Sequence, residues 1–347
     1  MVFWLLELEN PNNISFKKVF AMFNNQKDIN IAMIGCGYWG KNLARNFHEI
    51  GNLKAVCDPN PQTAENFRNL YDVPALSWEE VLADKEINAV ALAVPAEMHY
   101  GMAIAAMEKG KHVYVEKPIA LDVSEAEMMV AKSEETNLTL MVGHLLQYHP
   151  VFRKLKELVN NGKIGNVEYI YSNRLSLGKV RREENVLWSF APHDISMVLA
   201  LANEEPNKVT ATGKSYLGQD VEDITTANLE FPNGLKAHIF SSWTHPFKEQ
   251  RLVVIGNKGM LTFEDHQPWE EKLTYYAHSF DKGERETVPT KAGAEHIVVD
   301  QGEPLKDECQ HFVDSIVNEK APRTDGAEGL RVLKVLDAAT KSLKTGT

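Results

Sequence analysis

Cysteine is scarce in this chain, which has three in 347 residues: Cys36, Cys57 and Cys309. An odd number leaves one thiol without a partner, and no two of the three have the spacing of a metal site. The pattern therefore favours buried thiols in a reducing compartment over a disulfide framework. We expect a cytoplasmic protein, and we expect no bound metal.

The chain also lacks a long apolar run and an excess of positive charge. Residues 2–6 are apolar, but Glu7 and Glu9 follow at once, without the basic start or cleavage site of a signal peptide. No segment approaches the roughly 20 residues of a membrane-spanning helix. The formal net charge of −11, without a dense basic patch, argues against nucleic acid or a membrane as partner. We interpret residues 1–28 as an N-terminal extension whose role the sequence does not define.

The stretch from Ile29 to Asp58 carries the most informative pattern. A short apolar run precedes Gly35, Gly37 and Gly40 in G-x-G-x-x-G spacing, and a helical period and a second apolar run follow. The first glycine permits a tight turn, the second a close approach to a pyrophosphate, and the third close packing of helix and strand. The amino end of the helix offers free N–H groups to phosphate. This order predicts a dinucleotide site, with a purely structural strand–turn–helix as the alternative.

The same stretch indicates which dinucleotide binds. Asp58 lies about 20 residues past the glycines, where a carboxylate accepts hydrogen bonds from the ribose hydroxyls of NAD. It would repel the 2′-phosphate of NADP, and the next residues, Pro59 and Asn60, bring no arginine. NAD is therefore the expected cofactor. Tyr38 and Trp39, inside the glycine loop, are expected to cover the phosphates or ribose, or else to pack on the helix.

The chain divides into two halves of different texture. Apolar strands alternate with helical segments from residue 29 to 142, which predicts an α/β Rossmann domain with a mostly parallel sheet. From residue 167 short strand-like runs follow one another, with one helix near 191–201 and two closing helices at 304–318 and 326–344. This predicts an α+β domain with a largely antiparallel, open sheet. We place the NAD-binding domain at residues 29–147 and the substrate and oligomerisation domain at 148–347, with the last helices packing back on the first domain.

Residues directly after the predicted parallel strands are site candidates, because ligands of such sheets bind at the carboxyl ends of the strands. Pro95 and His99 follow the strand at 89–94, and Glu116 and Lys117 follow the strand at 112–115. We expect Pro95 and His99 to line the cofactor cleft, although His99 suits a packing role nearly as well. Glu116 is expected to contact the nicotinamide ribose or to orient Lys117, which would lie beside the nicotinamide.

With Glu-Lys-Pro at residues 116–118 after the glycine motif, the chain resembles the Gfo/Idh/MocA oxidoreductases from residue 29 to 343. The resemblance implies hydride transfer between a nicotinamide and a sugar-like carbinol. It places the family's lysine at Lys117 and its histidine at His193, in the segment LWSFAPHDIS. The family usually has an aspartate four residues before this histidine. Here that place holds Ser189, and Asp194 follows the histidine instead, so the sequence leaves the proton relay open.

The expected chemistry requires a base for the hydroxyl proton while the hydride leaves. A partly buried Lys117 would have a lowered pKa, and the pKa of a histidine such as His193 needs little adjustment. We expect Lys117 to bind the reacting hydroxyl and His193 to act as the base or beside it. The structural alternatives are a solvated loop lysine and a helix-terminal histidine bonded to backbone.

The segment SNRLSLGKVRREENVLWSFAPHDIS resembles a narrower branch, the nucleotide-sugar 3-dehydrogenases. This implies oxidation of the 3-hydroxyl of UDP-N-acetylglucosamine, or of its uronic acid, before an aminotransferase makes a 3-amino sugar for lipopolysaccharide or other surface glycans. The expected substrate contacts are Tyr148, Arg174, Lys179, Arg181, Trp188, His193 and Asp194. The alternative for the basic residues is a solvated loop balanced by Glu183 and Glu184.

Other hypotheses stay open beside this one: a dehydrogenase of a free sugar or inositol, a glycosidase that retains NAD, and a non-catalytic NAD-binding regulator. The presence of both Lys117 and His193 argues against the regulator. The sequence leaves open whether the sugar has a C6 carboxylate, and whether NADH leaves or is reoxidised in place by a second substrate such as 2-oxoglutarate. The sheet of the second domain has a face to cover beyond its helices, which predicts a homodimer or homotetramer.

Overall fold

The computed structural model describes residues 29–178, 180–218, 220–282 and 286–346. The predicted N-terminal extension at 1–28 and the substrate candidate Lys179 lie outside these residues. Within the described chain, five parallel strands form the first sheet in the order β2-β1-β3-β4-β5. The strands are β1 (Ile31–Ile34), β2 (Leu53–Cys57), β3 (Ala89–Leu92), β4 (His112–Glu116) and β5 (Leu140–Gly143).

Both faces of this sheet are covered, which explains why its strands read as continuous apolar runs. Every residue of β1, β3 and β5 is buried. The covering segments of the first half are α2 (Gly40–Glu49), α3 (Pro61–Tyr71), α4 (Trp78–Ala83), η1 (Ala96–Met98), α5 (His99–Glu108) and α6 (Val123–Thr136). A capping box opens α4, in which Ser77 and Glu80 exchange both of the expected hydrogen bonds. The predicted Rossmann architecture is therefore confirmed.

A larger mixed sheet forms in the second half, in the order β15-β12-β11-β10-β6-β9-β8-β7 over the described residues. Only β6 and β9 pair in parallel among these neighbours, so the sheet is largely antiparallel, as predicted. Its strands are β6 (Val167–Leu177), β7 (Lys208–Lys214), β8 (Ile224–Glu230), β9 (Lys236–Ser242), β10 (Thr244–Gly256), β11 (Gly259–Glu264), β12 (Leu273–Tyr276) and β15 (Ala294–His296).

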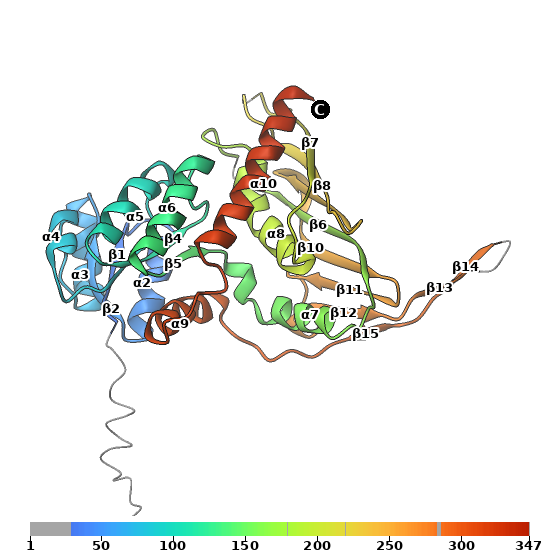
Figure 1. Ribbon diagram of the computed structural model, residues 1–347, viewed down its shortest axis with the longest axis horizontal. Helices are drawn as coiled ribbons and strands as arrows, with labels where there is room; N and C mark the ends of the chain where they lie inside the picture. Colours follow the sequence, from blue (N-terminus) through green and yellow to red (C-terminus); the bar gives the residue numbers. More distant parts are fainter. Residues whose placement is uncertain (1–28, 179, 219, 283–285, 347) are drawn as a thin grey trace, which may run out of the picture.

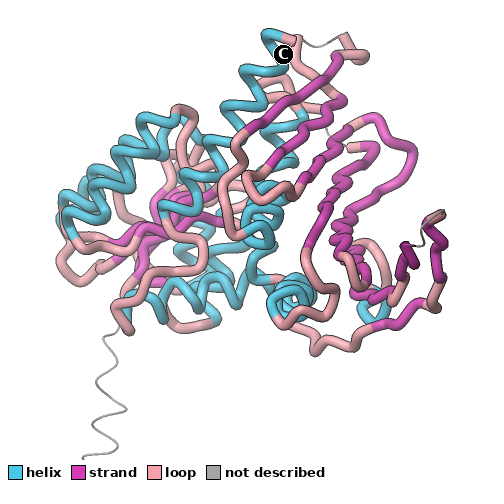
Figure 2. Tube along the Cα trace, turned by 45° about the vertical axis from the view of Figure 1, so that its right-hand side comes forward, coloured by secondary structure: helices cyan, strands magenta, loops and turns pink. Residues whose placement is uncertain are grey.

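The long helices lie on one side of this sheet and leave the other side uncovered (Figure 2). The covering helices are α7 (Pro150–Asn160), α8 (Val186–Ala202) and α10 (Gly326–Thr345). Alternation along β9 reflects this arrangement, since Ala237 and Ile239 are buried in the core whereas His238 is only half-buried. On the uncovered face the rings of Tyr171 and His238 stack 5.4 Å apart.

Helix α8 begins at Val186, five residues before the predicted start, and this expectation was wrong. Pro192 makes the true extent of this helix hard to predict, because proline favours the first turn of a helix over its interior. In the structure Asn185 caps the helix by accepting a hydrogen bond from the Trp188 N–H at 3.1 Å, and Pro192 lies inside. His193 is consequently in the middle of the helix rather than at its amino end.

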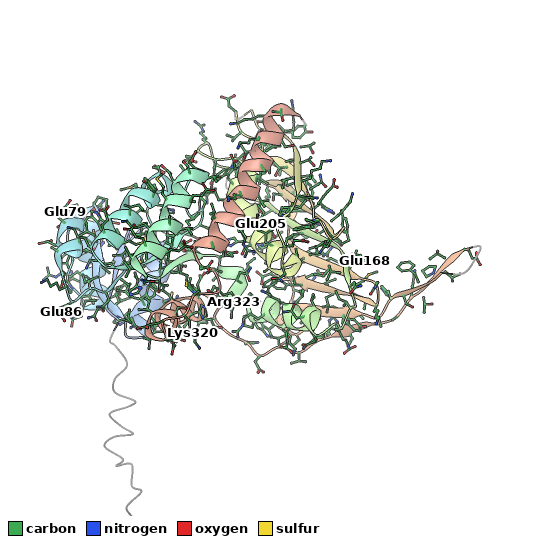
Figure 3. All side chains as sticks on the ribbon, viewed as in Figure 1. Glu79, Glu86, Glu168, Glu205, Lys320 and Arg323 are labelled. Carbon is green, nitrogen blue, oxygen red and sulfur yellow. The ribbon has the colours of Figure 1, made fainter. Side chains whose placement is uncertain are left out.

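The last two helices join the halves of the molecule (Figure 1). Helix α9 (Pro304–Val317) packs on α2, and Phe312 meets the rings of Phe47 and Tyr114 edge-on. Helix α10 packs on α6 of the first half and on α8 and β7 of the second. The loop between them carries Arg323, labelled in Figure 3, which donates to the carbonyl oxygen of Gln147 in η2 (Leu145–Tyr148).

A long projection leaves the second sheet beyond β12 (Figure 1). It ends in a hairpin of β13 (Ser279–Lys282) and β14 (Thr287–Thr290), and the short η3 (Trp269–Glu271) precedes β12. The sequence analysis missed this hairpin, because its short polar strands give almost no alternating pattern. Phe280 and Val288 are exposed on it, at 57% and 48%.

Candidate active site

The glycine loop between β1 and α2 has the shape that a pyrophosphate requires. Gly35 has φ of +85°, and a side chain at Gly40 would place its Cβ 1.9 Å from the carbonyl oxygen of Gly35. A Cβ at Gly37 would instead meet nothing within 4 Å, so this backbone is open to a ligand. No side chain caps the amino end of α2, and its first turn has no acid. These residues fit a dinucleotide phosphate.

Asp58 lies at the end of β2 and is held by backbone alone. Its two carboxylate oxygens accept hydrogen bonds from the N–H groups of Cys36 at 2.7 Å and Asn60 at 2.9 Å. The carboxylate is thus fixed beside the glycine loop and half-exposed. Its negative charge suits ribose hydroxyls and opposes a 2′-phosphate, as the sequence analysis expected.

The two aromatic residues of the glycine loop behave differently. Tyr38 is 84% exposed, with the ammonium of Lys41 4.9 Å from its ring centre. Trp39 is half-buried and donates its indole N–H to Oε1 of Glu116 at 2.5 Å. Tyr38 is therefore free to meet a cofactor, whereas Trp39 links the glycine loop to the end of β4.

Glu116 is half-buried at the end of β4, beside the buried Tyr114. The hydroxyl of Tyr114 lies 3.3 Å from its Oε1, and a side chain at Gly143 would crowd both groups. Burial raises the pKa of Glu116, while the bond from Trp39 and the charge of Lys117 act in the opposite direction. Glu116 also accepts a hydrogen bond from the backbone N–H of Lys117 at 3.3 Å. This contact agrees with the alternative role considered for Glu116, which was to orient Lys117.

Pro95 and His99 lie in the segment that follows β3. Pro95 precedes η1 and is half-buried. His99 is 1% exposed, with its two ring nitrogens 2.8 Å from the carbonyl oxygen of Pro118 and 3.0 Å from that of Val94. His99 therefore bridges the loops after β3 and β4. These contacts agree with the packing role that the sequence analysis gave as its alternative.

Lys117 reaches helix α8, where Nζ donates to the backbone carbonyl of Ser189 at 3.3 Å. Residue 189, where the family usually has an aspartate, therefore still contacts Lys117, but the contact is made by its backbone carbonyl and not by its side chain. Burial lowers the pKa of Lys117, the charges of Glu184 and Glu116 raise it, and those of Arg181 and Arg174 lower it. The lysine is therefore held where it can exchange a proton more readily than a solvated one.

His193 lies four residues after Ser189, about one helical turn along, and so on the side of α8 that Lys117 contacts. Burial holds the pKa of His193 well below its usual range, and the charges of Lys117, Arg174 and His144 lower it further. Its Nδ1 is buried and has no hydrogen-bond partner among the described residues. The neutral ring can accept a proton, which is what the predicted base must do.

Two family profiles match the sequence of this chain. The Gfo/Idh/MocA profile, described as an oxidoreductase family with an NAD-binding Rossmann fold, matches residues 29–144, and the family's C-terminal domain matches residues 152–262. The chain belongs to the Gfo/Idh/MocA oxidoreductase family. It is an NAD-dependent enzyme of this group of sugar dehydrogenases, and NAD is its cofactor.

Individual relatives of this oxidoreductase act on different sugars. It is 29% identical to the UDP-N-acetylglucosamine 3-dehydrogenase of Acidithiobacillus ferrooxidans, over 87% of this chain and 93% of that protein. It is 27% identical to the scyllo-inositol 2-dehydrogenase (NAD+) of Bacillus subtilis, over 92% and 96%. A solved structure of the Acidithiobacillus ferrooxidans enzyme superposes with a TM-score of 0.81 at 24% identity, over 91% and 98% of the chains.

Two of the basic residues predicted to contact the substrate, Arg174 and Arg181, form ion pairs within the protein. Asp194 is buried and accepts Nε of Arg174 at 2.5 Å and the hydroxyl of Ser172 at 2.6 Å. Arg181 pairs with Glu184 at 2.8 Å, and its side chain stays 48% exposed. Arg181 is consequently the more available cation for a substrate, and Asp194 serves to hold Arg174.

The two predicted aromatic contacts with the sugar have structural partners. Trp188 is half-buried and donates its indole N–H to Thr340 at 2.9 Å, between the cores of the two halves. Tyr148 is 1% exposed, shares a hydrogen bond with Thr324 and packs under the guanidinium of Arg323. Packing accounts for Tyr148, and we leave it out of the proposed substrate contacts.

The sequence analysis missed a buried pair near His193. His144, directly after β5, lies with Nδ1 2.5 Å from Oε2 of Glu328 in α10. The position of His144 at a strand end was a usable signal. Glu328 gave none, because 184 residues separate it from its partner.

The described part of the chain was also searched for a metal site and for a membrane-spanning helix. Across the described ranges, no group of three or more His, Cys, Asp or Glu side chains is placed to hold a metal ion. Within the same ranges, no helix has the length and apolar character needed to cross a membrane.

Proposed function

We propose that this enzyme oxidises the 3-hydroxyl of a UDP-N-acetylhexosamine, UDP-N-acetylglucosamine or its uronic acid, to the 3-keto sugar. The observation that carries the proposal is the match along 93% of a UDP-N-acetylglucosamine 3-dehydrogenase, which includes both domains. The half-exposed Arg181, within electrostatic range of Lys117, supports an anionic substrate on a chain of net charge −11. The product would feed an aminotransferase that makes a 3-amino sugar of a surface glycan.

The residues of the chain have distinct roles in this proposal. Lys117 donates a hydrogen bond to the reacting hydroxyl and orients it, while its other contact is the Ser189 carbonyl. His193 takes the hydroxyl proton. Asp58 and the glycine loop hold the dinucleotide, which when bound accepts the hydride at its nicotinamide ring. Glu116, fixed by Trp39, holds the backbone where the loop after β4 begins at Lys117.

A dehydrogenase of a free sugar or inositol is the second candidate. The observation in its favour is the ion pair of Arg174 with Asp194, since Arg174 is then not free to bind a diphosphate. The match with scyllo-inositol 2-dehydrogenase spans nearly the same part of the chain.

A product assay tests the proposal against this alternative. The enzyme is incubated with NAD, with and without 2-oxoglutarate, and with UDP-N-acetylglucosamine, its uronic acid or scyllo-inositol. A 3-aminotransferase traps the keto sugar as an amino sugar for mass spectrometry. We expect product from one of the nucleotide sugars. Product from inositol alone, with NAD demonstrably bound, would favour the second candidate.

Lys117→Ala serves as the catalytic control in this assay. Removing the group that orients the hydroxyl should lower turnover by about 10²–10⁴-fold. NAD binding should stay within a few-fold, because Asp58 and the glycine loop are untouched. A near-normal rate in Lys117→Ala would remove Lys117 from the mechanism. If the wild-type protein binds NAD but turns over none of the sugars, the regulator or glycosidase hypothesis would be favoured.

A further inference from the structure

A groove of about 1270 Å³ lies at the edge of the first sheet opposite the glycine loop. Its lining includes residues at the amino ends of four strands, namely Ile29 before β1, Asn88 before β3, His112 at the start of β4 and Leu140 at the start of β5. Ligands of parallel sheets bind at the carboxyl ends of the strands. The groove is therefore separate from the proposed NAD site and from the proposed catalytic pair.

The lining of the groove combines apolar surface with charges of both signs. Leu82, Val130 and Leu138 are half-buried in it, and Ala321 is exposed. Four lysines, among them the Lys320 labelled in Figure 3, and four acidic residues also line it. Because these charges balance, the groove does not favour a strongly charged ligand. The surface that a partner would remove from water is its apolar part.

The described chain begins at the wall of this groove. Ile29 lines it, and the next residue is bonded to the adjacent wall. The backbone N–H of Asn30 donates to the side chain of Asn88 at 2.8 Å, and its carbonyl oxygen accepts the N–H of Asn88 at 2.9 Å. The side chain of Asn30 donates to the carbonyl oxygen of Glu86 at 2.8 Å. The point to which residues 1–28 are attached is thus fixed beside the groove.

The sequence before Ile29 carries an apolar pattern a short distance away. Four apolar residues recur at i, i+3, i+4 and i+7, the spacing of one helix face: Phe16, Val19, Phe20 and Phe23. Only the polar residues at 24–28 separate this pattern from Ile29. The six steps from Phe23 to Ile29 span at most about 22 Å. The apolar pattern is therefore tethered within reach of the groove.

We propose that residues 16–23 of the same chain occupy this groove, with their apolar face against its apolar lining. The tether favours this occupant over a free partner, because a short flexible link raises the effective concentration of the segment to about millimolar. Contact with Leu82 and Leu138 would remove apolar surface of both sides from water. The inference goes beyond the proposed function and does not depend on it, since the groove lies at the other edge of the sheet.

The test is site-specific photo-cross-linking in the full chain. A phenylalanine that bears a benzophenone group replaces Phe20, the protein is irradiated, and mass spectrometry of the digest identifies the peptide that is joined to it. We expect the joined peptides to hold residues 82–88, 130–140 or 316–327, which line the groove. The same probe in place of Lys18, on the opposite face of the pattern, should join these peptides several-fold less.

Variants of the groove make the test specific. Ala83→Arg and Ala321→Arg each place a long charged side chain in the groove at an exposed position, so the core is untouched. Either change should lower the yield of joined groove peptides about tenfold, because it fills the space and sets a charge against the apolar segment. Ala131→Arg is the matched control, since Ala131 is exposed on α6 outside the lining. It should leave the yield unchanged.

The size of the joined product distinguishes the possible occupants. A link within one chain migrates as a monomer on a denaturing gel, which is the expected result. A link that migrates as a dimer would show that a second copy supplies the segment and would overturn the proposal. Joined peptides from outside the groove, no link at all, or equal yields in wild type and Ala321→Arg would also reject it. The readout needs neither NAD nor a sugar, so its failure is distinguishable from failure of the proposed function.

Discussion

At the scale of single residues, the orientation of Asp58 is set by hydrogen bonds from the backbone N–H groups of Cys36 and Asn60. The carboxylate is therefore ready for a ribose before the cofactor arrives. Asp58→Ala should weaken NAD by about 10- to 100-fold, since bonds to a charged group contribute about 1.5–3 kcal/mol. It should also narrow the preference for NAD over NADP. Calorimetric titration with both dinucleotides measures the two effects.

Asp58→Asn is the control for this prediction, because it keeps the shape and removes the charge. It should recover discrimination only in part, as the amide cannot repel a 2′-phosphate. If the ratio of the NAD and NADP dissociation constants is the same in all three proteins, the assignment of Asp58 to the ribose is wrong.

Residues of local motifs were predictable, and residues paired over a long range were not. The glycine loop, Asp58 and Lys117 lie at strand ends within one continuous pattern, and the structure has them at one edge of the sheet. The bond of Trp39 to Glu116 joins residues 77 apart. Such pairing depends on how helices and sheets pack, which periodicity does not specify. The sequence suggested Asp194 as a substrate contact, and only the fold shows it paired with Arg174.

At the scale of elements, α8 matters because it carries Ser189, His193 and Ser196 past the proposed site. Pro192 inside α8 cannot donate a backbone hydrogen bond to the preceding turn. The stability of the first turns of the helix therefore depends more on the cap at Asn185. The side chain of Asn185 both accepts the Trp188 N–H and donates to Glu222 at 2.8 Å. Asn185→Ala should lower stability by about 1 kcal/mol. Urea unfolding followed by circular dichroism measures the loss.

Asn185→Ser is the comparison for this prediction. Serine still accepts the backbone N–H but loses the bond to Glu222, so it should regain most of the cap contribution. Equal losses in the two variants would mean that the bond to Glu222, and not the cap, stabilises this end of α8.

At the scale of the whole molecule, we expect the uncovered face of the large sheet to pack against a second copy of the chain. Tyr169, Tyr171 and His238 form an aromatic cluster there, in which the hydroxyl of Tyr169 lies 2.8 Å from Nδ1 of His238. Aromatic residues of this kind are enriched at protein interfaces. We expect a homodimer or homotetramer in sedimentation velocity, with Tyr171→Asp shifting it toward monomer.

Tyr216→Asp is the control, since Tyr216 is 70% exposed and belongs to the loop after β7 rather than to this face. It should leave the sedimentation coefficient unchanged. A wild-type chain that sediments as a monomer at all micromolar concentrations would contradict the predicted assembly.

The course of α10 also sets an order in time for a chain made from its amino end. The glycine loop and the five strands of the first sheet are complete by residue 143, but Glu328, the partner of His144, lies in the last helix. A growing chain therefore holds every residue of the glycine loop and of the first sheet long before it holds Glu328. Until α10 has been made, His144 lacks the carboxylate that it contacts in the finished protein, so this contact is among the last to become possible.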